Sequence, residues 1–214
     1  MGVGNVASGG PQVLRLPDGD EDHRAGGDLT IGWRRRRRWR WSRRRGGDHW
    51  TRRGRPPAID VTIEQDIAPT AAHYLDLYDR VGRLWLWYER RLYTERALTE
   101  LLNAPDHELH VARHGDELVG YFEIGGNEIA FFGLTPAYIG KRIGPWLLDR
   151  AIERGFARGA DRLLLNTNTV DHPKALDTYR KAGFRVVRSE SRELQDPRVL
   201  WPDIYRWPPQ VTSK

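Results

Sequence analysis

The sequence predicts a mixed α/β (α+β) domain in which a mostly antiparallel sheet is flanked by about four helices. Three patterns predict this fold class. Residues 58–64 alternate apolar and polar side chains, as a half-buried strand does. Residues 114–117, His-Gly-Asp-Glu, separate two apolar runs, which is typical of a β-hairpin turn. After residue 144, helical and strand-like patterns alternate, which indicates helical crossovers between strands.

Two helices are expected after the first strand. Apolar side chains recur at helical spacing in residues 71–81. They do so again in residues 94–103, where Thr94 can cap the helix. An aromatic stretch, residues 84–88, joins the two segments.

Three strands follow these helices. Residues 109–113 and 118–124 are expected to form the hairpin. A second turn, Gly125-Gly126-Asn127, leads into a strand over residues 128–134. Because both connections are short turns, the first half of the sheet is predicted to be antiparallel.

The last part of the chain is predicted to alternate between helices and strands. A helix begins at Gly144-Pro145, where the missing N–H of proline costs nothing. A buried strand over residues 163–165, a helix over 173–182 and a strand over 184–187 follow. Residues 191–214 are expected to add an edge strand and then to fray.

The composition excludes several kinds of chemistry. The chain has no cysteine, so disulfides, thiolate metal sites and a cysteine nucleophile are excluded. This favours a reducing compartment, and we expect a cytoplasmic protein. No apolar run approaches the roughly 20 residues that cross a bilayer, so no transmembrane segment is expected. We also find no apolar core of a secretory signal.

The N-terminal region, residues 1–57, differs from the expected domain, residues 58–190. It shows no sustained periodicity, and we expect it to be disordered. Its residues 33–55 contain twelve arginines and one acidic residue, Asp48. One interpretation is a tail without a role, or an upstream stretch translated from a misassigned start. The other is binding to nucleic acid or an anionic membrane, since tryptophans can stack on bases or lie at a membrane interface while arginines bind phosphates.

The segment that says most about chemistry is residues 138–145, Tyr-Ile-Gly-Lys-Arg-Ile-Gly-Pro, between an expected strand and an expected helix. A helix N-terminus presents unpaired backbone N–H groups, and glycines let a pyrophosphate approach the main chain. The spacing fits neither a Walker loop nor a dinucleotide fingerprint. An ordinary strand-to-helix turn is the alternative interpretation.

Residues 139–144 resemble the acyl-CoA motif of the GCN5-related N-acetyltransferases (the GNAT superfamily), Gln/Arg-x-x-Gly-x-Gly/Ala. Gly140 and Gly144 stand where the resemblance requires them. Ile139 departs from the usual Gln or Arg. Arg142 replaces the first motif glycine, so its side chain either points away or adds a cation to the phosphate site. The resemblance implies the GNAT fold and acetyl-CoA as the acyl donor.

Residues 171–184 resemble a second GNAT pattern, Asn-x-x-Ala-x-x-x-Tyr-x-x-x-Gly-Phe, with His172 at the asparagine position. In that family the tyrosine lies near the CoA sulfur and can protonate the departing thiolate. The resemblance therefore implies that Tyr179 is the general acid, a role that suits a phenol with a reference pKa of about 10. The alternative is that Tyr179 is an aromatic side chain of the core.

The resemblance also implies a base and an oxyanion donor. Glu128 matches the position of the general-base glutamate of histone acetyltransferases, while Glu123 and a proton relay through His172 are alternatives. The family stabilises the oxyanion with a backbone N–H that here belongs to Leu134. The implied acyl-CoA-binding residues are Leu134, Ile139, Gly140, Lys141, Arg142, Ile143, Gly144, His172 and Tyr179.

The acceptor is expected beside the aromatic stretch, because this segment borders the acceptor site in the GNAT superfamily. Trp85, Trp87 and Tyr88 are therefore the candidate substrate-binding residues, although packing explains aromatic side chains equally well. We expect no metal site. On a strand His107 and His110 face opposite sides, so no set of histidine ligands forms.

These patterns predict an enzyme that moves an acetyl group directly from acetyl-CoA to a primary amine of a small-molecule acceptor. One alternative is an acyl-CoA-binding sensor or interaction module with weak catalysis. Another is association with nucleic acid or membrane through the Arg/Trp-rich residues 33–55.

Overall fold

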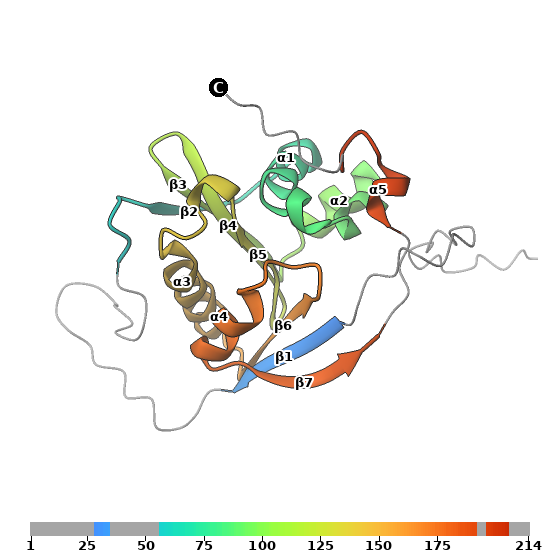
Figure 1. Cartoon of the computed structure of the whole chain (residues 1–214). Coiled ribbons are helices and arrows are strands. Elements are labelled where there is room, and N and C mark those ends of the chain that lie inside the picture. Colours follow the sequence, from blue (N-terminus) through green and yellow to red (C-terminus); the bar gives the residue numbers. More distant parts are fainter. Residues whose placement is uncertain (1–27, 35–55, 192–195, 206–214) are drawn as a thin grey trace, which may run out of the picture.

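The computed structural model describes residues 28–34, 56–191 and 196–205. In this part of the chain one mixed sheet carries helices on both of its faces (Figure 1). The fold class predicted from the sequence, a mixed α/β domain with a mostly antiparallel sheet flanked by helices, is confirmed.

The first half of the sheet is an antiparallel meander, as predicted. It consists of β2 (Thr62–Asp66), β3 (His107–His114), β4 (Glu117–Gly125) and β5 (Glu128–Leu134). Gly115 and Gly126 occupy the two hairpin turns with φ of 56° and 55°, a region that glycine enters without steric cost. β2 begins four residues later than the alternating pattern predicted.

Two helices cover one face of this meander. α1 (Ala71–Gly82) is capped by Thr70, and α2 (Glu95–Leu102) is capped by Thr94, as predicted. The short helices η1 (Arg83–Trp85) and η2 (Glu89–Leu92) connect them through the aromatic stretch. The helices bury their apolar sides against β3 and β4. The fully buried residues of this layer include Tyr74, Leu77, Tyr78, Leu98, Leu109 and Tyr121.

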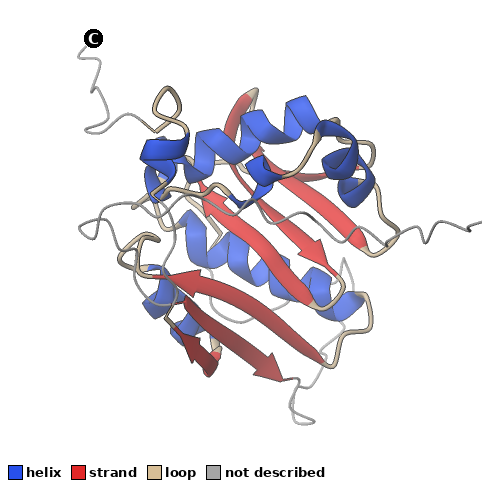
Figure 2. Cartoon of the chain, turned by 90° about the vertical axis from the view of Figure 1, so that its right-hand side faces the viewer, coloured by secondary structure: helices blue, strands red, loops and turns tan. Residues whose placement is uncertain are grey.

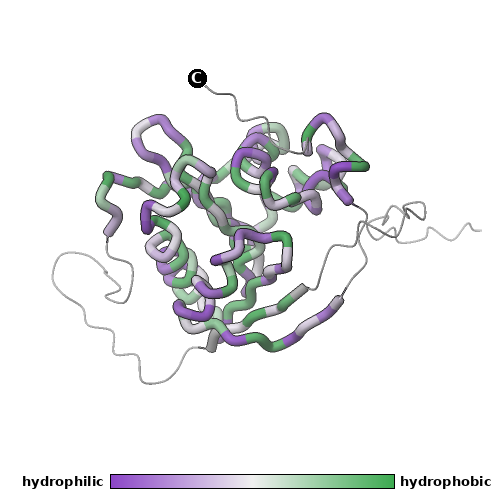
Figure 3. Tube along the Cα trace, viewed as in Figure 1, coloured by the Kyte–Doolittle hydropathy of each residue, from purple (hydrophilic) through white to green (hydrophobic). Residues whose placement is uncertain are grey.

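The second half of the chain covers the other face. The order is η3 (Pro136–Tyr138), α3 (Ile143–Ala157), β6 (Arg162–Asn168), α4 (Ala175–Ala182) and β7 (Arg185–Glu190). α3 supplies most of the larger core, whose members include Phe122, Ile124, Ile129, Leu147, Leu148, Phe156 and Leu163. Apolar stretches of the Cα trace accordingly gather along the inner strands and helices (Figure 3).

The prediction that residues 1–57 are disordered is wrong for residues 28–34. These residues form β1 (Asp28–Arg34), which is inserted between β6 and β7 and pairs antiparallel with both. Ile31 is buried in the larger core and Gly32 lies beneath Val187, so the segment packs as an interior strand. The arginine run that follows Arg34, and hence the predicted nucleic-acid or membrane contact, lies outside the described residues.

The sheet order is therefore β2-β3-β4-β5-β6-β1-β7, with β2 at one edge and β7 at the other (Figure 1). The edge strand predicted within residues 191–214 is not present in the described residues 196–205. They contain the short helix α5 (Pro197–Leu200), capped by Asp196. The hydroxyl of Tyr205 donates a hydrogen bond to the carbonyl of Trp87, which attaches this segment to the aromatic stretch. Among the helices described, none has the length and apolar character to cross a membrane.

The two halves of the sheet are joined by very few paired residues. β5 and β6 run parallel and pair at Glu128↔Leu164 and Ile129↔Leu165, and within the described chain the pairing stops there. At the same point β5 gains an extra residue, Ala130, opposite β4. Beyond it the two groups of strands diverge (Figure 2). We call the facing edges of residues 130–134 and 166–168 the β5–β6 seam.

We predict that Ile31→Ala lowers the free energy of unfolding by about 2–5 kcal/mol, because Ile31 is 1% exposed in the core and its removal leaves a cavity. Denaturant unfolding of the full chain measures this change. The matched control is Ile67→Ala, since Ile67 is 85% exposed and contributes little to packing. Equal stability of the wild type and the Ile31→Ala variant would show that β1 does not hold the sheet together.

Candidate active site

The turn between β5 and α3 presents free backbone donors. Gly140 has φ of 83°, and no atom lies within 4 Å of the position where a Cβ would stand. Arg142 precedes α3 as its N-cap in the left-handed region, φ 62°, and in the described chain no side chain caps this helix. The first turn of α3 carries no acid. The helix therefore keeps its N-terminal N–H groups and its positive dipole end for an anion.

The side chains of this turn differ in burial. Those of Lys141 and Arg142 are exposed, whereas Ile143 is fully buried and anchors the helix start. A left-handed arginine costs roughly 1 kcal/mol relative to glycine, a strain that the surrounding turn holds. The Lys141 ammonium lies 4.6 Å from the ring centre of Tyr138. The two residues before α3 are thus exposed cations.

The backbone N–H of Leu134 points into the β5–β6 seam. Thr135 donates its N–H to the carbonyl of Val119 on β4 at 2.9 Å. Successive residues of an extended strand direct their N–H groups to opposite edges, so the N–H of Leu134 faces away from β4. β6 forms no ladder with this part of β5 in the described residues, and the edge of β5 is available to another partner.

Tyr179 belongs to α4, and its side chain is buried in the larger core between this helix and the sheet. Its ring contacts Phe132 of β5 and Phe184 edge to face, with ring centres 6.1 Å and 6.3 Å apart. Burial raises the pKa of the Tyr179 phenol, and the negative charge of Asp171 raises it further. Tyr179 is therefore neutral, and its phenol holds the proton more tightly than a free tyrosine does.

Asp171 and His172 lie in the turn between β6 and α4. His172 accepts the backbone N–H of Lys174 at Nδ1, 3.0 Å away, which leaves Nε2 as its protonated nitrogen in the neutral ring. The His172 ring meets Trp85 edge to face, with ring centres 5.0 Å apart. Asp171 accepts the indole N–H of Trp87 at 3.2 Å. Two of the three candidate acceptor aromatics thus contact this turn.

The three aromatics differ in their surroundings. Trp87 packs against Phe131, with ring centres 5.1 Å apart, and fills the space beside two glycines, Gly82 and Gly133. A Cβ at Gly82 would come within 2.3 Å of the Trp87 ring. Tyr88 packs instead against Trp201, 6.2 Å away. Trp87 thus packs closely within this layer, whereas Trp85 contacts the turn that carries His172.

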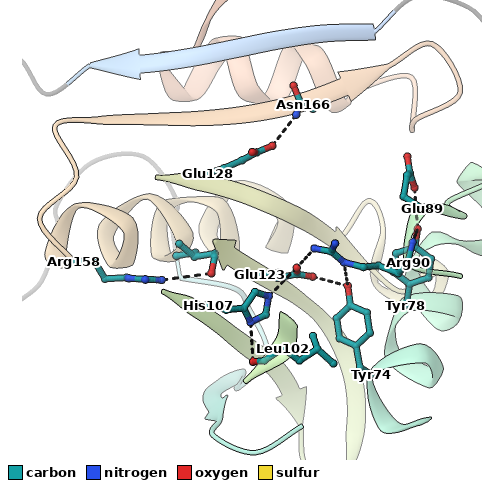
Figure 4. Close-up of polar contacts among 11 residues, drawn as sticks. Tyr74, Tyr78, Glu89, Arg90, Leu102, His107, Glu123, Glu128, Arg158 and Asn166 are labelled. Carbon is teal, nitrogen blue, oxygen red and sulfur yellow. Dashed lines mark hydrogen bonds and ion pairs between the residues drawn. The ribbon is translucent and has the colours of Figure 1, made fainter. Parts of the chain in front are cut away.

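Glu128 lies where β5 and β6 are still joined. It stands opposite Gly125 of β4, which places its side chain on the sheet face that also carries Glu123. Its carboxylate accepts a hydrogen bond from Asn166 Nδ2 across the two strands at 2.7 Å (Figure 4). Burial raises the pKa of Glu128, and the charge of Arg90 and the bond from Asn166 oppose this shift.

Glu123, the alternative base, is sealed in the interior. It is 0% exposed and forms an ion pair with Arg90, accepts the hydroxyl proton of Tyr74, and lies 2.8 Å from His107 Nε2 (Figure 4). Burial opposes its ionisation, but these partners outweigh burial and lower its pKa. These contacts join α1, η2, β3 and β4 through one carboxylate.

The predicted orientation of the histidines of β3 is confirmed. His107 turns toward Glu123 beneath α1 and α2, whereas His110 stacks on Phe122 on the other face, with ring centres 4.6 Å apart. Sequence reasoning gave no role to Asn166 or Asp171. Asp171 opens the segment that resembles the second GNAT pattern, which is the signal that could have drawn attention to it.

Residues 74–184 match the family model described as the acetyltransferase (GNAT) family. The match covers more than half of the chain and excludes β1 and β2. The chain therefore belongs to this family and is a GNAT-type N-acetyltransferase. No curated protein sequence matches it.

Several solved structures resemble the chain. One is the aminoglycoside acetyltransferase HMB0005 from an uncultured soil metagenomic sample, with a TM-score of 0.50, 20% identity, and coverage of 64% of this chain and 97% of that one. A transcriptional regulator from Bacillus halodurans C-125 has a TM-score of 0.49, 29% identity, and coverage of 64% and 99%. The aminoglycoside acetyltransferase meta-AAC0020, also from an uncultured soil metagenomic sample, has a TM-score of 0.47, 17% identity, and coverage of 57% and 87%. The first of these supports the fold.

We predict that Arg90→Met lowers the free energy of unfolding at pH 7 by about 3–5 kcal/mol, because it leaves the Glu123 carboxylate buried without its cation. Thermal or denaturant unfolding measures the loss. In a Glu123→Gln background the same substitution costs less, since no charge is stranded. The matched control is Arg96→Met, whose exposed pair with Glu100 should leave stability unchanged.

The same pair predicts a pH dependence. Because the folded-state pKa of Glu123 is lowered, its stabilisation is complete above the unfolded-state pKa of about 4.3 and is lost as pH falls through the folded-state value. The stability difference between wild type and Arg90→Met should therefore shrink as the pH falls below about 4. A difference that stays constant between pH 7 and pH 3 would contradict this assignment.

Proposed function

We propose that the chain transfers the acetyl group of acetyl-CoA directly to a primary amine of a small-molecule acceptor. The observation that carries this proposal is the β5–β6 seam. There the free edge of β5, the uncapped N-terminus of α3 and the buried phenol of Tyr179 come together from three separate elements. Membership of the acetyltransferase family supports the same reaction type.

The residues present fit an acyl-CoA. Its pyrophosphate requires N–H donors and positive charge, and the start of α3 offers uncapped N–H groups, the open backbone of Gly140 and Gly144, and the exposed Lys141 and Arg142. Ile139 and Ile143 line the turn. The pantetheine amides require backbone partners, which the free edge of β5 supplies up to Leu134. When bound, acetyl-CoA supplies an activated acetyl thioester.

Two groups of this chain then act on the acetyl thioester as the amine nitrogen bonds to its carbonyl carbon and the carbon–sulfur bond breaks. The N–H of Leu134 stabilises negative charge on the thioester oxygen. The neutral phenol of Tyr179 donates its proton to the departing sulfur. His172, one residue beyond Asp171, borders the same end of the seam through its contact with Trp85.

Glu128 is the proposed general base. Its raised pKa brings the carboxylate closer to the pH at which a base is effective, and Asn166 fixes its direction. It lies on the face covered by α1 and α2, while Tyr179 belongs to the core beneath α3 and α4. Proton removal from the amine and proton donation to sulfur are thus assigned to opposite faces of the sheet. A proton is accepted on one face and supplied on the other.

The acceptor is assigned to the face that carries Glu128 and the aromatic stretch. Trp85, beside His172, and Tyr88 are half-buried aromatic side chains, and Trp87 forms the wall behind them. Aromatic faces attract cationic amines, which agrees with a small amine as acceptor. Glu128 supplies the negative charge that such an amine requires.

The experiment that tests the function follows free CoA release by the full chain with acetyl-CoA and a panel of primary amines. Amine-dependent release, together with micromolar acetyl-CoA binding by calorimetry, supports an acetyltransferase. Acetyl-CoA binding without CoA release, whichever amine is added, supports the alternative of a sensor or interaction module. No binding overturns the assignment of residues 139–144.

We predict that Tyr179→Phe lowers kcat by about 10²-fold with little change in KM for acetyl-CoA, because the phenol proton is needed only as sulfur departs. Steady-state CoA release measures both constants. Tyr93→Phe removes an equivalent hydroxyl from an exposed site and should keep the wild-type rate. An unchanged kcat for Tyr179→Phe would show that Tyr179 is only a core residue.

We predict that Glu128→Gln lowers kcat/KM for the amine and removes the acidic limb of its pH profile. Glu128 must be ionised to accept a proton, and its raised pKa places this limb above the usual value of about 4.5. Profiles between pH 5 and pH 9 measure the limb, with Glu100→Gln, an exposed glutamate on α2, as the control. A variant that keeps the wild-type profile would place the base elsewhere.

A further inference from the structure

The turn that follows β6 is a closed network of hydrogen bonds around Asp171. Asn168 Oδ1 accepts the backbone N–H groups of Val170 and Asp171, at 3.0 Å and 3.1 Å. In return Asp171 Oδ2 accepts the hydroxyl of Thr167 at 2.8 Å and the backbone N–H of Asn168 at 3.1 Å. Two of these bonds hold the Asp171 carboxylate directly and two hold its backbone turn, and all four come from the end of β6 and the residues that follow it.

The second oxygen of this carboxylate leaves the turn. Asp171 Oδ1 accepts the indole N–H of Trp87 at 3.2 Å, across 84 positions of sequence. Trp87 is wedged between Phe131 and Tyr78, with ring centres 5.1 Å and 5.6 Å away, in space that Gly82 and Gly133 leave open. Packing thus holds the Trp87 ring in one position. The bond to Asp171 then fixes the β6–α4 turn relative to this ring.

The same turn leads into the helix that carries Tyr179. Asp171 is close enough for its charge to raise the pKa of the Tyr179 phenol. The neighbouring contact between His172 and Trp85 joins the aromatic stretch to the β6–α4 turn a second time. The β6–α4 turn therefore contacts the acceptor aromatics and also positions the proposed general acid.

The geometry points to Asp171 as a positioning residue that ties the acceptor wall, through Trp87, to the turn that places Tyr179. This inference rests on the proposed function, because it assigns Trp87 to the acceptor side and Tyr179 to the departing sulfur. Asp171 itself contacts neither the acceptor amine nor the departing sulfur. It acts by setting the distance between Trp87 and Tyr179.

The substitution Asp171→Asn isolates this role. An amide has one acceptor oxygen, and the backbone N–H of Asn168 cannot reverse its polarity, so that oxygen stays within the turn. The hydroxyl of Thr167 keeps donating to the same oxygen. The amide NH₂ is then left facing the indole N–H of Trp87, two donors without an acceptor. The tether to Trp87 is lost while the turn is kept.

The test uses the full chain and two readouts. The first is the indole N–H signal of Trp87 in a ¹H–¹⁵N spectrum, identified by its disappearance in Trp87→Phe. The second is CoA release with acetyl-CoA and 2-phenylethylamine as the acceptor. The matched control is Asp177→Asn, an exposed acid in the first turn of α4.

We expect Asp171→Asn to shift the Trp87 signal and to lower kcat/KM for the acceptor about tenfold, with KM for acetyl-CoA unchanged. Trp87→Phe should lower it by a similar factor, and the double variant by about tenfold rather than a hundredfold, since both changes break one contact. Asp177→Asn should match the wild type in both readouts.

Other outcomes overturn the inference. An unshifted Trp87 signal in Asp171→Asn shows that the tether does not exist in solution. Multiplying effects in the double variant show that the two residues act independently. If the wild type releases no CoA at all, the proposed function fails and the catalytic role falls with it, while the spectrum still reports on the tether.

Discussion

Two residue pairs, Glu128↔Leu164 and Ile129↔Leu165, join the halves of the sheet, and the properties of the site follow from how short this join is. A fully paired parallel ladder would use the N–H and C=O groups of β5 and leave nothing for a ligand. The extra residue at Ala130 turns β5 away from β6 just past the join. A strand edge in the middle of a sheet is thereby exposed where α3 begins and where Tyr179 reaches β5.

A sheet divided in this way needs strong pairing on both sides of the division. On one side the β2-β3-β4-β5 meander is held by hairpins and by the Arg90–Glu123 pair beneath α1 and α2. On the other side β6 would have a poorly supported edge, and β1 supplies the missing partner over seven positions. The N-terminal strand therefore supports β6, whose Asn166 orients Glu128 and whose following turn carries Asp171.

The sequence predicted most of the domain because its local patterns agree with its tertiary structure. Thr94, Gly115 and Gly126 perform the capping and turn roles that their residue types indicate. β1 was missed because Asp-Leu-Thr-Ile-Gly-Trp-Arg has the alternation of a strand but runs directly into the arginine-rich stretch, whose composition dominated the prediction. The network around Asp171 depends on contacts across 84 positions, which no local pattern reveals. The burial of Glu123 likewise follows from three distant partners.

The place of β1 also has a consequence for how the chain is made. β1 emerges from the ribosome early, but Ile31 pairs with Leu165 and Val186, both more than 130 positions later. At roughly 5–20 residues per second, this separation corresponds to a wait on the order of ten seconds. Throughout this interval a segment with strand-forming alternation has no partner within its own chain. The arginine-rich stretch that follows it carries like charges on every copy of the chain, and like charges repel.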